Sequence, residues 1–276
     1  MPVNGQPHES IATSDRGLAY GDGLFETILI HQGTPILLAA HLDRLEEGAR
    51  RLKIPLDRGQ LEAEIAELSA NFPEQGVLKL MVTRGSGGRG YAPPDSPEPV
   101  HILGLHDLPA YPDNLFSSGI DVFVCQQRLA RQPALAGIKH LNRLEQVLAS
   151  MEWPNDTYME GLMLDTEGHV IEGTRSNIFW VQDGELMTPS LFQCGVAGIM
   201  RNYLASCLGQ VREVDDCSLA QLCKAREVFF CNSIFGVWPV RKIQSGDTEV
   251  TFPADQRHFS HVANKAVSEL LASVST

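Results

Sequence analysis

A proline-containing segment near the middle of the chain separates two stretches that each mix strand and helix patterns. Leu108-Pro109-Ala110-Tyr111-Pro112-Asp113 puts two prolines and a turn residue between apolar segments, which is typical of an interdomain linker. We therefore expect a small N-terminal α+β domain over residues 1–107, a linker over 108–115 and a larger, strand-rich C-terminal α+β domain over 116–276. Because strands and helices do not alternate as a repeating β-α-β unit, the predicted fold class is α+β.

Hydrophobic periodicity predicts the elements of both halves. In the N-terminal half, strands are expected at 3–6, 24–30, 77–83 and 100–105, and helices at 39–52 and 60–70. In the C-terminal half, strands are expected at 120–125, 158–164, 170–172, 177–181 and 228–231, and helices at 142–151, 198–208 and 253–272. Residues 14–17 are expected to form a turn.

Charge and composition exclude several classes of partner. The net charge is −12, from 34 acidic and 22 basic residues, which argues against nucleic acid and anionic membranes. Residues 1–10 are polar and unlike a signal peptide, and no apolar run reaches membrane-spanning length. The six cysteines show no C-x-x-C spacing, and His258 and His261 have no further ligand nearby. We therefore expect reduced thiols, a cytoplasmic location and no metal site.

Lys139 is the first candidate for chemistry. It lies between Ile138 and His140, just before a helical pattern. An amine that loses hydration between apolar neighbours has a lowered pKa and becomes a nucleophile for imine formation. The alternative interpretation is a solvated surface lysine, which is what most lysines are.

A glycine-rich segment, Gly85-Ser86-Gly87-Gly88-Arg89-Gly90, follows a predicted strand and formally fits G-x-G-x-x-G. The dinucleotide fingerprint requires a helix after the last glycine, and Pro93 and Pro94 prevent one here. Two interpretations remain open. The segment is either a flexible surface hairpin or a mobile substrate loop on which Arg84 and Arg89 bind carboxylates.

Two further segments suggest binding of an anion and of a cation. Gly195-Val196-Ala197-Gly198-Ile199-Met200 leads into a helix without a capping side chain, so either phosphate or water satisfies the first amides. Glu172 ends an apolar strand, and a partly buried carboxylate needs a partner. That partner is either Arg175, in a structural ion pair, or a protonated ring nitrogen of a cofactor.

Together with an arginine on the early helix over 39–52, these segments supply an imine-forming amine, an acid for a ring nitrogen and two phosphate anchors. Those are the requirements of pyridoxal 5′-phosphate. The motifs that carry these groups resemble, in order and over nearly the whole chain, those of the class IV aminotransferase family, the fold-type IV pyridoxal-phosphate enzymes. They are Ser14-Asp15-Arg16, Tyr20-Gly21-Asp22-Gly23-Leu24-Phe25-Glu26-Thr27, His41-Leu42-Asp43-Arg44-Leu45, Lys139, Glu172-Gly173-Thr174-Arg175-Ser176-Asn177-Ile178-Phe179 and Gly195-Val196-Ala197-Gly198-Ile199.

The resemblance implies a two-domain fold like that of D-amino-acid aminotransferase, with a role for each matching residue. Lys139 should hold the cofactor covalently and move protons, and Glu172 should keep the pyridine nitrogen protonated. Arg44 and the backbone amides of Ile199 and Met200 should bind the phosphate. Further cofactor contacts are implied for Asn177, Asn232 and Ser233. Members of the family usually form homodimers, so we expect one here.

Within the family, residues 84–91 and 135–143 most resemble the 4-amino-4-deoxychorismate lyase branch, which makes 4-aminobenzoate and pyruvate for folate synthesis. A small dicarboxylate substrate is then expected, with Tyr20, Thr27, Arg84, Arg89 and Tyr91 as candidate substrate-binding residues. Two alternatives remain open. One is a D-amino-acid or branched-chain aminotransferase of the same fold, and the other is a non-catalytic binding protein that kept the fold.

Overall fold

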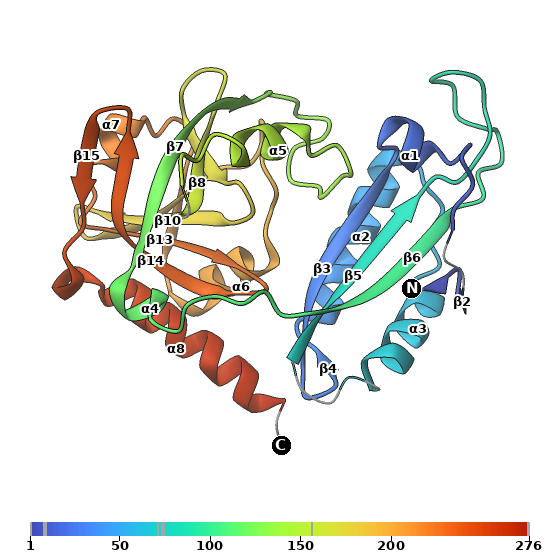
Figure 1. Ribbon diagram of the computed structural model, residues 1–276, viewed down its shortest axis with the longest axis horizontal. Helices are drawn as coiled ribbons and strands as arrows, with labels where there is room; N and C mark the ends of the chain where they lie inside the picture. The colour runs from blue at the N-terminus through green and yellow to red at the C-terminus, as the bar shows by residue number, and fades with distance from the viewer. Residues whose placement is uncertain (1, 8–9, 71, 73–74, 156, 275–276) are drawn as a thin grey trace. The chain divides into compact units, whose positions relative to one another are not determined.

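A computed structural model describes residues 2–7, 10–70, 72, 75–155 and 157–274. The chain divides into two units, each compact in itself (Figure 1). Unit 1 comprises Met1–Pro109, Ile138–Asn142 and Leu271–Thr276, and unit 2 comprises Ala110–Gly137 and Arg143–Leu270. The first crossing, after Pro109, falls within the predicted linker. Residues 138–142, which carry Lys139, group with unit 1, whereas their place in the chain assigned them to the C-terminal domain.

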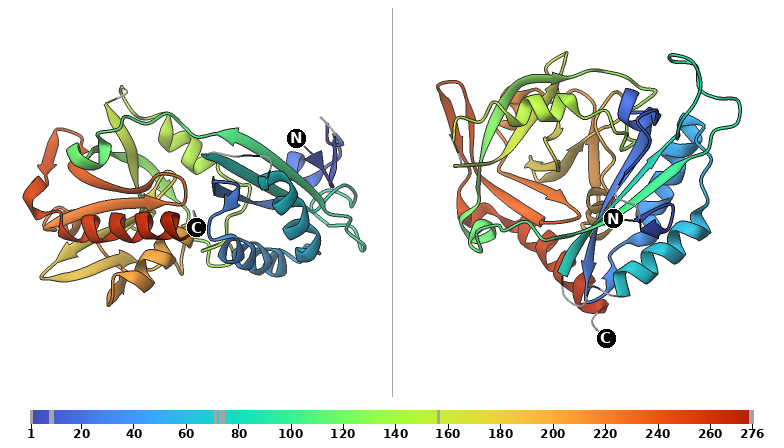
Figure 2. Two further views of the ribbon diagram at one scale, coloured as in Figure 1. Left: turned by 90° about the horizontal axis from the view of Figure 1, so that it is seen from below. Right: turned by 45° about the vertical axis from the view of Figure 1, so that its right-hand side comes forward.

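Unit 1 is built on a six-stranded sheet with strand order β2-β1-β6-β5-β3-β4. Its central strands are antiparallel, with residues 23–31 paired to residues 83–75. Helices α2 and α3 lie on the same face of this sheet (Figure 2). The elements are β1 (Pro2–Val3), β2 (Gln6–Pro7), α1 (Arg16–Tyr20), β3 (Gly23–His31), β4 (Thr34–Pro35), α2 (Leu38–Leu52), α3 (Arg58–Ala70), β5 (Gln75–Thr83) and β6 (Val100–Asp107).

Alternation along β3 explains how unit 1 packs. Leu24, Ile28 and Ile30 are buried, because successive side chains of a strand point to opposite faces and every second one faces the helices. On α2, Leu42 and Leu45 are buried at helical spacing, as the sequence predicts. Phe25 and Thr27, at the intervening positions of β3, are only half-buried and point to the face without helices.

Unit 2 contains a nine-stranded sheet with the order β12-β11-β10-β13-β14-β7-β8-β9, and β15 pairs with β14. Additional pairing of β10 with β9 joins two strands that are far apart in that order. The elements are α4 (Leu115–Ser118), β7 (Ile120–Leu129), α5 (Leu144–Ser150), β8 (Tyr158–Asp165), β9 (Val170–Gly173), β10 (Asn177–Gln182), β11 (Glu185–Pro189), α6 (Ile199–Cys207), β12 (Val211–Val214), α7 (Leu219–Leu222), β13 (Glu227–Asn232), β14 (Gly236–Ser245), β15 (Thr248–Thr251) and α8 (His258–Ser273).

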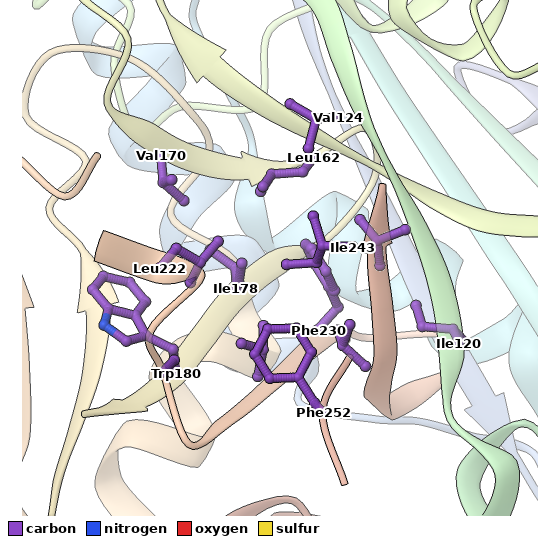
Figure 3. Close-up of a cluster of buried hydrophobic side chains, with 14 of the residues drawn as sticks. Ile120, Val124, Leu162, Val170, Ile178, Trp180, Leu222, Phe230, Ile243 and Phe252 are labelled. Carbon is purple, nitrogen blue, oxygen red and sulfur yellow. The ribbon is translucent and has the colours of Figure 1, made fainter. Parts of the chain in front are cut away.

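The main core of unit 2 lies among its strands. Ile178, Trp180 and Phe230 are fully buried in one cluster to which β7, β8 and β14 also contribute (Figure 3). On adjacent strands, the Phe179 and Phe229 rings stack with centroids 5.1 Å apart. Large apolar side chains at successive positions of β10 explain why this strand reads as a continuous apolar run rather than an alternating one.

The α+β class and the strand-rich second half are confirmed, but some elements differ from prediction. Residues 14–17 do not form a plain turn. Asp15 caps α1 there by accepting from the amides of Gly17 and Leu18 at 2.7 and 3.4 Å. The helix predicted over 253–272 is interrupted, with a 3₁₀ turn at Ala254–Gln256 before α8. Glu227 of β13 fixes that restart, because it accepts from the amides of Phe259 and Ser260. Among the described residues, no helix is long and apolar enough to cross a membrane.

Candidate functional site

Lys139 lies on a short extended segment that adds to the edge of the unit 1 sheet. The amide of Phe25 donates to the carbonyl of Lys139 at 2.9 Å, and the amide of Leu141 donates to the carbonyl of Gly23 at 3.0 Å. The Lys139 Nζ lies 4.3 Å from the centroid of the Phe25 ring, and Ile138 beside it is buried. Backbone pairing on both sides therefore fixes the lysine, and an aromatic face partly removes its amine from solvent.

Arg44, the predicted phosphate anchor, takes part in a buried charged group that we call the Glu26 group: Glu26, His41 and Arg44. Arg44 donates through Nε to Glu26 Oε1 at 2.8 Å and through Nη2 to Oε2 at 2.5 Å. His41 Nδ1 lies 2.7 Å from Glu26 Oε2. Glu26 comes from β3 and the other two residues from α2, and Glu26 is only 1% exposed. The bidentate contact orients the guanidinium and holds it on the sheet.

The electrostatics of the Glu26 group follow from burial and from its cation. Burial raises the pKa of Glu26, but the charge of Arg44 and the hydrogen bonds from His41 and Arg44 outweigh it, leaving the pKa at about 2. Burial lowers the pKa of His41, and the positive charges of Arg44 and Lys139 lower it further against the opposing effect of Glu26. Glu26 is therefore an anion and His41 is neutral at neutral pH. The tautomer with the proton on Nδ1 satisfies Glu26, and the buried Nε2 has no hydrogen-bond partner among the described residues.

The predicted substrate-binding residues also lie in unit 1, and the structure gives them different environments. Arg84 is buried, donates to both oxygens of Asp22 at 2.7 and 2.9 Å, and also donates to the carbonyls of Leu52 and Lys53. This gives Arg84 a structural role in place of a solvent-facing one. Arg89 and Tyr91 are exposed on the glycine-rich segment, and the rings of Tyr20 and Tyr91 lie 5.5 Å apart. Thr27 lies on the helix-free face of β3, beside Phe25.

In unit 2, Glu172 and Asn177 hold the same backbone residue. Glu172 is buried and accepts from the amide of Val196 at 2.8 Å, and Asn177 donates through Nδ2 to the Val196 carbonyl at 2.9 Å. The two are direct neighbours across β9 and β10. The alternative partner for Glu172, Arg175, instead donates to the carbonyl of Met159 and lies 3.9 Å from Glu160.

The start of α6 has the geometry of an anion site. Gly198 is its N-cap residue and no side chain caps the helix, so the first amides, those of Ile199 and Met200 included, point out of its N-terminus. The side chain of Asn177 packs closely against the main chain at Gly198, where a Cβ would lie 1.9 Å from Asn177 Oδ1. Asn177 thus shapes the backbone that leads into the helix.

Asn232 is the last residue of β13, and Ser233 follows it in the turn to β14. Asn232 Oδ1 accepts from the amides of Ile234 and Phe235 at 2.9 and 2.8 Å, and its Nδ2 donates to the Arg175 carbonyl at 3.2 Å. Asn232 therefore forms the turn that carries the half-buried Ser233. Across the described ranges, no group of three or more His, Cys, Asp or Glu side chains is arranged to hold a metal ion.

Sequence reasoning did not assign a role to Glu26 or to the buried Glu160. Both have a signal in the sequence, since each is a carboxylate within a predicted apolar strand, and a buried carboxylate needs partners. The partners themselves could not be read from the local pattern, because those of Glu26 lie on α2 and those of Glu160 include Thr174 and Ser176 in the turn before β10.

The chain belongs to the amino-transferase class IV family, which it matches over residues 23–243. It is 48% identical to a 4-amino-4-deoxychorismate lyase of Pseudomonas aeruginosa, whose crystal structure superposes with a TM-score of 0.89, covering 98% of this chain and 97% of that one. It is also 37% identical to an aminodeoxychorismate lyase of Vibrio harveyi, over 91% of this chain and 94% of that protein. A putative branched-chain-amino-acid aminotransferase of Methanocaldococcus jannaschii is 32% identical, over 84% and 82% of the two chains.

Enzymes of this family use pyridoxal 5′-phosphate, and the residues of this chain fit that cofactor. Unit 1 supplies an immobilised primary amine at Lys139 and an oriented guanidinium at Arg44. Unit 2 supplies a buried carboxylate at Glu172 and an uncapped helix start at Gly198, where a Cβ would displace the side chain of Asn177. These are the donors and acceptors that an aldehyde, a pyridine nitrogen and a phosphate require.

Proposed function

We propose that the protein is a pyridoxal-phosphate-dependent lyase that converts 4-amino-4-deoxychorismate into 4-aminobenzoate and pyruvate, a step of folate synthesis. The observation that carries this proposal is the similarity to the Pseudomonas aeruginosa lyase, at 48% identity over 98% of the chain. The match spans the lysine segment and the glycine-rich segment, which are the two stretches that resemble lyases most in sequence.

The geometry within each unit supports the cofactor-binding roles that we propose. Lys139 holds the cofactor covalently through its Nζ, and the negative charge of Glu172 keeps the ring nitrogen protonated. The bound cofactor supplies an electron-accepting ring. Arg44, oriented by Glu26, and the first amides of α6 hold the phosphate. We include Asn177, Asn232 and Ser233 as residues that shape or contact this site.

Lys139 is also the proton carrier of the reaction. Its Nζ, set free when the amine of the substrate takes its place, would take the proton from C4 of the substrate, and the C–O bond to the enolpyruvyl group would then break at the neighbouring ring carbon. The leaving group takes up a proton and becomes pyruvate, and the ring becomes aromatic, which makes the step downhill. Arg89, Tyr91, Tyr20 and Thr27 are the proposed substrate-binding residues. Arg84, the remaining candidate, is held by Asp22 and by the carbonyls of Leu52 and Lys53, so we propose an indirect role for it.

Pyruvate release tests this function directly. The protein is incubated with the cofactor and 4-amino-4-deoxychorismate, and pyruvate and 4-aminobenzoate are followed together. We expect equal amounts of both products, and a rate at least about 10²–10⁴-fold lower for Lys139→Ala. Lys265→Ala is the matched control, since Lys265 is an exposed lysine of α8. Borohydride reduction followed by peptide mass analysis should find the cofactor on Lys139.

A branched-chain or D-amino-acid aminotransferase is the second candidate, favoured by the 32% identity to the Methanocaldococcus jannaschii protein. In that case, ketoacid-dependent amino transfer would occur and no pyruvate would be released from aminodeoxychorismate. A protein that does neither and cannot be trapped with the cofactor would be the non-catalytic alternative.

We further propose that the protein forms a homodimer and is cytoplasmic. An exposed apolar stripe on α5 and its C-cap residue is a surface that a second copy could cover; it is formed by Leu144, Val147 and Leu148 of the helix and by Met151. Leu144→Glu/Leu148→Glu should convert a dimer to a monomer in light scattering, whereas Phe192→Ser, at a separate exposed position, should not. All six cysteines are free thiols, which suits the cytoplasm, and cell fractionation tests the location.

A further inference from the structure

Arg16 is a buried arginine in unit 1 that no part of the proposed reaction uses. It begins α1 and is 5% exposed. Its Nε donates to Asp22 Oδ2 at 2.9 Å, and its two terminal nitrogens, Nη1 and Nη2, donate to other acceptors. When only one nitrogen of a buried guanidinium donates to a carboxylate, its remaining N–H groups need other acceptors.

Those partners are all main-chain carbonyls of one loop. Arg16 Nη1 donates to Gly90 at 3.1 Å and, at 3.4 Å each, to Gly87 and Ala92, and Nη2 donates to Tyr91 at 3.1 Å. A single side chain therefore ties four carbonyls within residues 87–92, which we call the Arg16 loop. Hydrogen bonds from a charged donor are stronger than those between neutral groups.

The loop is closely packed as well as tied. A Cβ at Gly88 would lie 2.2 Å from the Ala92 carbonyl oxygen, and Gly88 has a φ of +79°. Glycine is required there because the main chain folds back on itself, so its presence does not by itself indicate flexibility. Arg89 and Ala92 also exchange a pair of backbone hydrogen bonds, both 3.2 Å long.

The side chains that leave this fixed loop are the exposed candidates for substrate binding. Tyr91 is 88% exposed, yet its ring lies 5.5 Å from that of Tyr20, and the Arg16 guanidinium lies 4.9 Å from the same Tyr20 ring. Arg89, which is separated from Tyr91 only by Gly90, is also exposed.

We propose that Arg16 is a positioning residue for substrate binding. It holds residues 87–92 in one conformation, so that Arg89 and Tyr91 meet a carboxylate-bearing substrate already ordered. Preorganisation removes the entropy loss of ordering a glycine-rich loop when the substrate binds. The part of this inference that concerns substrate rests on the proposed function, whereas the holding of the loop does not.

Arg16→Lys tests the proposal, because it keeps the charge next to Asp22 and removes the planar group that reaches four carbonyls. Arg50→Lys is the matched control, since Arg50 is an exposed arginine of α2 paired with Glu47. Trypsin cleavage of the Arg89–Gly90 bond is followed by mass spectrometry. We expect slow cleavage in wild type and in the control, and cleavage about tenfold faster in Arg16→Lys.

Kinetics then separate positioning from general loss of structure. In Arg16→Lys, KM for aminodeoxychorismate should rise about tenfold while kcat and the absorbance of the bound cofactor stay within about twofold. A loss of kcat and of bound cofactor with unchanged KM in Arg16→Lys would overturn the positioning role. Cleavage of the Arg89–Gly90 bond in Arg16→Lys at the same rate as in wild type would overturn it as well. An absence of lyase activity in wild type would contradict the proposed function. The cleavage result would still show whether Arg16 holds residues 87–92.

Hydrogen exchange in wild type needs no variant and covers the case in which Arg16→Lys does not fold. The amides of Arg89 and Ala92 should exchange more slowly than those of an unstructured peptide, because each is bonded within the held loop. Exchange of both amides at the rate of an unstructured peptide would overturn the proposal.

Discussion

Each unit buries a carboxylate completely, but the two are stabilised by different kinds of partner. Glu26 in unit 1 is 1% exposed and is held by Arg44 and His41. Glu160 in unit 2 is 0% exposed and accepts from the amides of Gly161 and Thr174 and from the hydroxyls of Thr174 and Ser176.

This difference in partners shows what each carboxylate does for the residues nearby. Glu26 fixes a cation, so its removal leaves a largely buried charge without its partner. Glu160 fixes a backbone turn through four neutral hydrogen-bond donors, just before Asn177, and its one charged neighbour, the half-exposed Arg175, lies 3.9 Å away, beyond hydrogen-bond distance. Its removal therefore leaves mainly neutral groups to be satisfied. Charge pairing therefore orders the predicted phosphate arginine, and neutral hydrogen bonds order the strand that carries Asn177.

Glu26→Gln should have the largest effect. Removing one partner of a buried ion pair lowers stability by about 3–5 kcal/mol, and Arg44 should lose its orientation. Urea unfolding of the protein without cofactor measures the first effect, and cofactor titration measures the second as weaker binding. The matched control is Glu47→Gln, which breaks an exposed pair with Arg50 and should remain near wild type. Equal stability of Glu26→Gln and Glu47→Gln would contradict a special contribution of the buried pair between Glu26 and Arg44.

The pH dependence of stability comes next in size. The pKa of Glu26 is depressed from 4.5 to about 2, so its contribution, about 3 kcal/mol, is present above pH 4.5 and is lost as the pH falls towards 2. The pKa of His41 lies below 6.5, so the unfolded chain takes up that proton first and stability also declines as the pH falls below 6.5.

Urea titrations at several pH values test both parts. Glu26→Gln should show a flatter decline between pH 4.5 and 2, and His41→Gln a flatter decline just below pH 6.5. Parallel curves for wild type and both variants would contradict the assignment of these protons to the Glu26 group.

Glu160→Gln should have the smallest effect, a loss of about 1–3 kcal/mol. The amide keeps one acceptor oxygen, and the hydroxyls of Thr174 and Ser176 can rotate to face its NH₂ group. Urea unfolding beside Glu26→Gln ranks the two directly. A loss larger than that of Glu26→Gln would reverse the order expected from charged and neutral partners.

The residues that could be predicted from the sequence are those whose chemistry is local. The strand over 24–30, the helix over 39–52 and the uncapped helix start at 198 follow from periodicity and capping, and the structure has all three. The assignment of cofactor roles to Lys139 and Glu172 came from residue type together with family motifs, and it remains a prediction.

What could not be predicted depends on partners distant in the chain. Arg84 looked available for a substrate, but Asp22 and two carbonyls at the C-terminal end of α2 engage its guanidinium. The glycine-rich loop looked mobile, because nothing near it in sequence indicates that Arg16, about 70 residues earlier, binds its carbonyls. Likewise, β14 escaped prediction, since Pro239 within it argues against a central strand.

The assignment of residues 138–142 to unit 1 has a consequence for how such a chain can be divided. Residues 138–142 are preceded and followed in the chain by residues of unit 2, but their backbone hydrogen bonds are with β3. A gene fragment that ends at the linker would encode the rest of the small sheet but neither the segment paired with Phe25 nor Lys139, the proposed cofactor lysine. Recombination at that boundary would therefore exchange the glycine-rich loop between relatives, but Lys139 would always come from the other parent.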